Sequence, residues 1–186
     1  MRNPSVTQVL KPYSGYENVP EGYLDHATER GQRVHAACAS IALKVPILRR
    51  DPEDAGYIQS FRIWFDRYVV KVVGVELELR DPNLNFVGHL DFLFELISGM
   101  IPELRAGDLA VIDLKTPIVR QKAWRAQAVS YLHLAKINKY PARAAGSLQL
   151  DPEGGPARLN WYVENSPRDF AAFLNALSAH NYFKEG

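Results

Sequence analysis

A short apolar strand with charged residues set into it constrains the fold of this chain more than any other segment. Residues 109–114 read as a buried strand, yet Asp113 lies inside it and Lys115 follows two residues later. Charged groups are rarely buried without partners, because an unpaired charge in an apolar interior is costly. Residues two apart in a strand share a face, so Asp113 and Lys115 lie together while Ile112 and Leu114 pack on the other side. From spacing alone, a plain ion pair at a strand end explains this about as well as a functional site.

A second apolar strand carries another acid. Asp91 lies between Leu90 and Phe92 in the stretch GHLDF, and Glu76 belongs to the strand before it. If Asp91 and Asp113 converge, their like charges repel, and the arrangement needs a shared proton or a cation between them. Carboxylate oxygens are the ligands that Mg²⁺ and Mn²⁺ prefer, and Glu76 could supply a third. Glu76 and Glu78 could equally be a solvated strand face.

The periodicity of the whole chain predicts an α/β fold with a central mixed β-sheet flanked by helices. A Gly-, Pro- and Tyr-rich loop is expected over residues 12–24. Asp51, as helix cap before Pro52, starts the second helix. Ser166 is the expected cap of the last helix. The expected helices span 25–43, 51–70, 121–137 and 166–183, and the expected strands span 72–79, 85–97, 108–115, 143–150 and 158–163.

Two finer expectations concern side-chain faces. In the first strand, period-two alternation places Val73, Val75, Leu77 and Leu79 on one face, and Gly74, Glu76 and Glu78 on the other. The second helix is expected to bury Ile58, Phe61, Ile63, Phe65 and Tyr68 in part. Its lobe also carries Arg49, Arg50, Arg62 and Arg67 beside Tyr57, Phe61 and Trp64. Such aromatic rings could stack on single-stranded DNA, although they suit core packing just as well.

Composition limits the classes of function. The chain has 186 residues, 47% of them hydrophobic and 23% charged, which fits one domain, spanning 1–186. We divide it into a helical N-terminal lobe (25–70), a sheet and helix (71–163) and a C-terminal helix (166–183). No apolar run approaches the length of a membrane span, no secretory signal is evident, and a lone cysteine suggests a cytoplasmic protein. The net charge of +1 is not typical of a general nucleic-acid coating protein.

Taken together, these motifs resemble the PD-(D/E)xK nuclease superfamily, in particular its RecB-like exonuclease branch. The residues that carry the resemblance are the acid Glu76, Gly-x-x-Asp ending at Asp91, IDLKT around Asp113, and QAVSY with Gln127 and Tyr131. Upstream, RGQRVH with Gly31 and His35 resembles the Gly-x-x-x-His helix, and PSVTQVL resembles the start of phage-type and mitochondrial-genome-maintenance-type exonucleases. The resemblance covers roughly Ser5 to Tyr131.

The resemblance implies a restriction-endonuclease-like core and a role for each matched residue. His35, Asp91, Asp113 and the main-chain carbonyl of Leu114 would bind Mg²⁺ or Mn²⁺. Lys115 would position or activate the attacking water, and Glu76 would support the ion or bind a second one. Gln127 and Tyr131 would be partners of Lys115 or of the DNA backbone, although their i, i+4 spacing also suits plain packing. A lone helical histidine such as His35 is more often structural.

A basic group opens the helix after the active strand and is expected to contact DNA phosphates. It consists of Arg120, Lys122 and Arg125, although ordinary solvated charge explains them as well. The resemblance therefore implies a metal-dependent deoxyribonuclease, an exonuclease of recombination, repair or phage DNA processing, with DNA as its partner and the choice between single and double strands left open. Two alternatives remain: a catalytically silent DNA-binding module of the same fold, and a structure-specific endonuclease. An iron–sulfur cluster is not expected, because the four cysteines of the CRISPR-associated relatives are missing.

Overall fold

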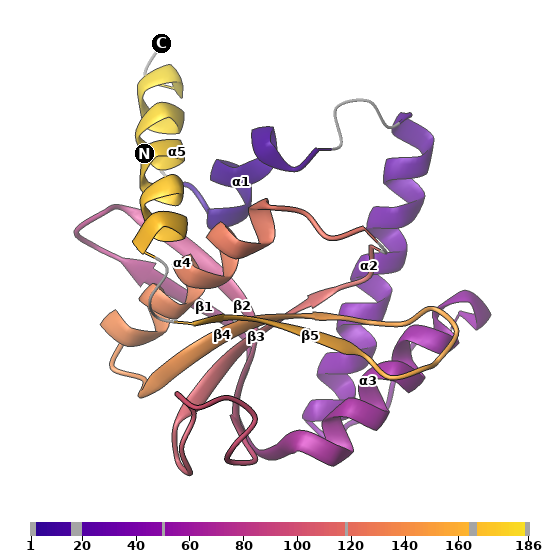
Figure 1. Ribbon diagram of the computed structural model, residues 1–186. Helices are drawn as coiled ribbons and strands as arrows, with labels where there is room; N and C mark the ends of the chain where they lie inside the picture. The colour runs from indigo at the N-terminus through magenta and orange to yellow at the C-terminus, as the bar shows by residue number, and fades with distance from the viewer. Residues whose placement is uncertain (1–2, 16–19, 50, 118, 164–166, 185–186) are drawn as a thin grey trace.

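The computed structural model describes residues 3–15, 20–49, 51–117, 119–163 and 167–184 (Figure 1). Its helices are α1 (Val6–Leu10), η1 (Lys11–Tyr13), α2 (Glu21–Ala42), η2 (Pro52–Asp54), α3 (Ala55–Tyr68), α4 (Ala123–Ile137) and α5 (Pro167–Lys184). Its strands are β1 (Val69–Asp81), β2 (Phe86–Leu96), β3 (Leu109–Lys115), β4 (Ala142–Gln149) and β5 (Arg158–Val163). The fold is α/β, as the sequence predicted. Within the described residues no helix is long and apolar enough to cross a membrane.

The five strands form one mixed sheet in the order β1-β2-β3-β4-β5. Every neighbouring pair is antiparallel except β3 and β4, which run parallel. Parallel neighbours need a crossover connection, and α4 supplies it between them. The crossover keeps α4 packed on the sheet beside the charged end of β3, which brings Gln127 and Tyr131 toward Lys115.

The sheet separates two hydrophobic cores (Figure 1). On one face, α1, α4 and α5 cover Leu90, Leu93 and Val111. On the other, α2 and α3 cover Phe92, Phe94, Ile112, Leu114 and Leu148. Ile112 and Leu114 therefore pack away from α4, as expected, and Asp113 and Lys115 share the opposite face, where their side chains contact each other.

The aromatic residues of the N-terminal lobe belong to the second core. Tyr57, Phe61 and Trp64 are at most 4% exposed, and the Phe61 ring stacks on Phe92 with centroids 5.4 Å apart. They cannot offer open faces to a single strand, so the structure selects core packing for them. Ile63, expected to be partly buried, is exposed because it lies on the solvent side of α3. Arg50 lies outside the described residues.

The segment predicted as a loop over 12–24 is partly helical, so that prediction is wrong at both ends. Tyr13 ends the 3-10 helix η1, and α2 already begins at Glu21, earlier than the expected Asp25. Asp51 does cap its helix, because its side chain accepts a hydrogen bond from the amide of Glu53. The first turn there is a separate 3-10 helix, η2. Ser166, the expected cap of α5, lies outside the described residues.

Strand β1 changes faces at Glu76, so the expected face of four apolar residues is wrong. Val75 packs with the α2–α3 core, whereas Leu77 and Leu79 pack with the α4 core on the opposite face. Glu76 adopts a left-handed conformation with φ of 50°. This conformation is strained for residues with a Cβ and interrupts the two-residue alternation. The switch occurs opposite Asp91, since Val75 pairs with Phe92 and Leu77 with Leu90.

Candidate functional site

The candidate site lies where β2 separates from β3. These antiparallel strands pair only from Phe92 opposite Ile112 to Glu95 opposite Leu109. Continuing the register by one step would place Asp91 opposite Asp113, so both acids lie immediately beyond the last pair. The sequence made a metal site conditional on the closeness of these two acids, and the register brings them to neighbouring positions on β2 and β3. The end of the pairing frees backbone groups that would otherwise bond within the ladder.

Asp91 connects three elements through its carboxylate. One oxygen, Oδ2, accepts a hydrogen bond from the backbone amide of Leu114 at 2.7 Å, and Oδ1 lies 3.2 Å from Nδ1 of His35 on α2. Asp91 is 9% exposed. Burial alone would raise its pKa, but the charges of His35 and Lys115 and the Leu114 hydrogen bond outweigh burial and lower it. Asp91 is thus held as a carboxylate.

Asp113 is buried beside the lysine that the sequence paired with it. Nζ of Lys115 lies 2.6 Å from Oδ2 of Asp113, and Asp113 is 3% exposed. Despite this contact, Oδ2 has no hydrogen bond of normal geometry to any described residue. Burial and the nearby Asp91 charge raise the pKa of Asp113 to about 6, against the lowering effect of Lys115. A second cation at this position would relieve the repulsion between the two acids.

Lys115 is positioned by the helix that follows its strand. Its Nζ donates a hydrogen bond to Oε1 of Gln127 at 2.9 Å, and Nε2 of Gln127 donates to the hydroxyl of Tyr131 at 3.1 Å. The ammonium also lies 5.6 Å from the ring centroid of Trp124, within cation–π range. Gln127 thus contacts Lys115 directly, whereas Tyr131 contacts Gln127, and contact of either residue with the DNA backbone stays a prediction.

The tightest group of possible metal ligands is His35, Glu76 and Asp91. Their ligand atoms all lie within 4.8 Å of one another. Burial and the Asp91 charge raise the pKa of Glu76. Asp113 is not part of this group, so Glu76 lies closer to the other ligands than the sequence suggested. A groove of about 500 Å³ opens beside the group and is lined by Thr28, Gly31, Gln32, His35, Ala36, Ala39 and Glu76.

The backbone carbonyl of Leu114 is a further candidate metal ligand. The amide and the carbonyl of one strand residue point to the same side of the strand, as ladder pairing requires. Because the Leu114 amide donates to Asp91, its carbonyl also faces the gap between β2 and β3. Carboxylate and carbonyl oxygens suit Mg²⁺ or Mn²⁺, whereas an imidazole nitrogen is more typical of transition metals, and the carboxylate of Asp113 is paired with Lys115. The residues present therefore fit a divalent cation.

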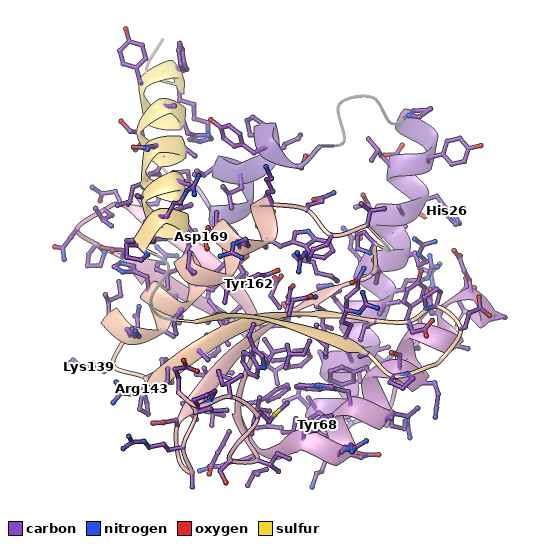
Figure 2. The ribbon with its side chains drawn as sticks, in the orientation of Figure 1. His26, Tyr68, Lys139, Arg143, Tyr162 and Asp169 are labelled. Atoms are coloured by element: carbon purple, nitrogen blue, oxygen red, sulfur yellow. The ribbon has the colours of Figure 1, made fainter. Side chains whose placement is uncertain are left out.

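The three basic residues expected to contact DNA form no described contact with the acidic residues of the candidate site. Arg120 donates to the side chain of Asn160, and Arg125 is paired with Asp169 of α5 at 2.8 Å. The guanidinium of Arg125 also lies 5.4 Å from the ring centroid of Tyr162. Tyr162 and Asp169 lie near each other on the α4–α5 side of the sheet (Figure 2). Lys122 is exposed at the start of α4. Their contact with DNA stays a prediction.

Two features of the structure escaped sequence reasoning. Helix α1 was not assigned as an element, although Ser5 and Gln8 form a capping box that the pattern Ser-x-x-Gln could have indicated. The left-handed conformation of Glu76 has no sequence signal, because glycine is the usual marker of positive φ.

The chain matches no model of a known protein family, and no curated protein sequence matches it.

Proposed function

We propose that this protein is a metal-dependent deoxyribonuclease with a restriction-endonuclease-like core, and that it acts as an exonuclease of the RecB-like type. The observation that carries the proposal is the meeting of Asp91, Asp113 and Lys115 at the divergence of β2 and β3, with His35 and Glu76 beside Asp91. An ordinary structural ion pair would need neither the second acid nor the histidine.

The ion would be held by His35, Asp91, Asp113 and the Leu114 carbonyl, with Glu76 as a further acid. A divalent cation bound by such groups polarises a phosphate oxygen and lowers the pKa of water. The remaining chemistry belongs to the protein. Hydrolysis forms a bond between a water oxygen and phosphorus, breaks the bond from phosphorus to the leaving sugar oxygen, and returns a proton to that oxygen.

Lys115 is the cationic group that the chain itself brings to this reaction. Its ammonium is fixed by Gln127 on one side and Asp113 on the other, which limits the rotamers of a long side chain. A fixed ammonium can orient the attacking water and stabilise the negative charge that develops on the phosphate. Because the charge is placed before the reaction begins, little reorganisation is needed at the transition state.

The proposal is tested with the full chain and fluorescent single- and double-stranded DNA. We expect cleavage with Mg²⁺ or Mn²⁺, none after chelation with EDTA, and recovery when the metal is returned. Products shortened stepwise from an end indicate an exonuclease, whereas internal cuts at branched substrates indicate a structure-specific endonuclease.

Two variants separate catalysis from binding. Asp113→Asn should abolish cleavage, while Glu78→Gln, a change at an exposed acid of the same strand as Glu76, should leave it unchanged. Wild-type protein that binds DNA without cutting it under any metal condition would instead be the silent DNA-binding module. Cleavage by Asp113→Asn at the wild-type rate would refute the assignment of the site.

A further inference from the structure

A buried hydroxyl lies just beyond the end of β3, on the side of the sheet that α2 covers. Thr116 follows Lys115 directly and is 7% exposed. Ile112 and Leu114 pack in the core under α2 and α3, and Thr116 continues their two-residue alternation by one step. A polar side chain therefore ends a row of apolar ones at the edge of this core.

The backbone on both sides of Thr116 is held in place. The carbonyl of Lys115 accepts a hydrogen bond from the amide of Leu150 at 2.9 Å, and the carbonyl of Pro117 accepts one from Nε2 of Gln149 at 2.8 Å. Within the described residues, no hydrogen bond involves the hydroxyl of Thr116. Because a buried hydroxyl without a partner costs free energy, its presence at this fixed position calls for a partner that the chain itself does not supply.

The hydroxyl of Thr116 faces a position on α2 that lacks a side chain. A Cβ added to Gly31 would lie 3.7 Å from Oγ1 of Thr116 and would approach no other described atom within 4 Å outside its own stretch of helix. An alanine would thus fit here in ordinary contact, and alanine is a better residue than glycine in a helix interior. Packing within the protein does not require glycine at this position.

The space over Gly31 belongs to the groove beside the candidate metal group. Gly31, His35 and Glu76 all line that groove, whose volume is about 500 Å³. Residues four apart on a helix lie on one side, so Gly31 and His35 face it together. Thr28 and Gln32 line the same wall and can donate hydrogen bonds to a phosphate. A group that fills this space would therefore lie next to the residues proposed to hold the metal.

We propose that the hydroxyl of Thr116 and the space over Gly31 form a subsite for a phosphate oxygen of the bound strand. The hydroxyl donates its hydrogen to the phosphate oxygen, and glycine lets the sugar–phosphate backbone approach α2 closely. Glu76 is acidic, so the subsite binds phosphate when a cation is present beside it. The inference deepens the proposed function and rests on it for the identity of the strand, but the subsite itself can be tested with inorganic phosphate.

The first test asks whether the protein needs either residue for its stability. Thr116→Val removes the hydroxyl at nearly constant volume, and Gly31→Ala adds one methyl group to α2. Both variants should have a Tm equal to or above that of wild type, because the first removes a buried unpaired group and the second favours the helix. Gly22→Ala is the matched control in the same helix, at a position with no atom within 4 Å. A clearly lower Tm of Thr116→Val would mean that the fold uses the hydroxyl and would overturn the inference.

The second test locates the phosphate with a fluorescent single-stranded oligonucleotide, in which one phosphate at a time is replaced by a neutral methylphosphonate. Binding is measured by anisotropy, with Ca²⁺ in place of Mg²⁺. Thr116→Val should bind the unmodified strand roughly ten-fold more weakly than wild type, the effect of one hydrogen bond to a charged group. At one position the methylphosphonate should weaken binding less in Thr116→Val and Gly31→Ala than in wild type or Thr116→Ser. Equal losses in all four proteins at every position would refute the subsite.

Inorganic phosphate separates this inference from the proposed function. With Mg²⁺ present and at constant ionic strength, phosphate should raise the Tm of wild type, Thr116→Ser and Gly22→Ala more than that of Thr116→Val and Gly31→Ala. The same rise in all five proteins would exclude a phosphate subsite at Thr116. If the rise depends on the variant but the protein neither binds nor cuts DNA, the nuclease proposal fails and the phosphate subsite stands.

Discussion

The carboxylate of Asp91 accepts a hydrogen bond from the backbone amide of Leu114 at 2.7 Å, just beyond the point where the pairing of β2 with β3 ends. A side chain here takes the place of the ladder bond that a continued strand pair would have made. The same carboxylate faces His35 through its other oxygen. One residue thus fixes the spacing of two strands and α2 around the proposed cation, so its substitution should affect structure and metal binding separately.

Two changes at Asp91 should separate these effects. Asp91→Asn keeps an oxygen that can accept the Leu114 amide, so its unfolding free energy should stay within about 1 kcal/mol of wild type, while affinity for Mn²⁺ falls at least about ten-fold. Asp91→Ala leaves a buried amide unsatisfied and should also lose about 1–3 kcal/mol of stability. Titration calorimetry with Mn²⁺ and urea unfolding measure the two quantities. Equal Mn²⁺ affinity in wild type and Asp91→Asn would exclude Asp91 as a ligand.

Substitution of Glu76 should change stability and function in opposite directions. Glycine tolerates its φ of 50°, so Glu76→Gly should raise the unfolding free energy by roughly 0.5–1 kcal/mol while weakening Mn²⁺ binding and cleavage. Glu78→Gly, the matched control at a residue without positive φ, should lower stability by roughly 0.5–1 kcal/mol and leave metal binding unchanged. Urea unfolding of both variants provides the comparison. Similar stability losses in the two would argue against strain at Glu76.

Lys115 should be required for cleavage but not for binding of the metal ion. Lys115→Ala removes the fixed ammonium and should slow single-turnover cleavage by at least about a hundred-fold. Its affinity for Mn²⁺ should be retained or increased, because the acids then lose a competing cation. Gln127→Leu should give a smaller loss in rate, since Asp113 and Trp124 still hold the lysine. If Lys115→Ala lost metal affinity in proportion to its rate, the role of Lys115 would be to assemble the site.

Asp81 gives a pH-dependent contribution to stability away from the site. It is 2% exposed, lies 2.7 Å from Nε2 of His133 and accepts the amides of Asn83 and Leu84. Burial would raise its pKa, but these hydrogen bonds more than offset burial, so the folded-state pKa is lowered. The stabilisation is therefore complete above the ordinary carboxyl pKa of about 3.9 and disappears as pH falls through the lower folded value.

Asp81→Asn should accordingly be less stable than wild type at pH 7, by about 1–3 kcal/mol. The difference should shrink as pH is lowered below about 4, because the wild-type carboxylate then becomes protonated. Urea unfolding followed by tryptophan fluorescence across this range measures it. A difference that does not change with pH would mean that the charge of Asp81 contributes nothing.

The sequence alone determined the α/β class, the five strands and the shared face of Asp113 and Lys115. These features follow from local periodicity, because residues two apart in a strand share a face and charges in an apolar strand need partners. Spacing alone placed Gln127 and Tyr131 on one side of a helix, which plain packing also explains, and only the structure shows that Gln127 contacts Lys115.

Only the tertiary structure decided the faces of β1 and the place of Glu76 beside His35. Each depends on groups far apart in the chain, or on a backbone conformation that the residue itself disfavours. Glu76 can hold its left-handed φ only because the surrounding strand pairing fixes it there. The local sequence pattern decides which residues of a helix or strand share a face. Packing decides which other element that face contacts.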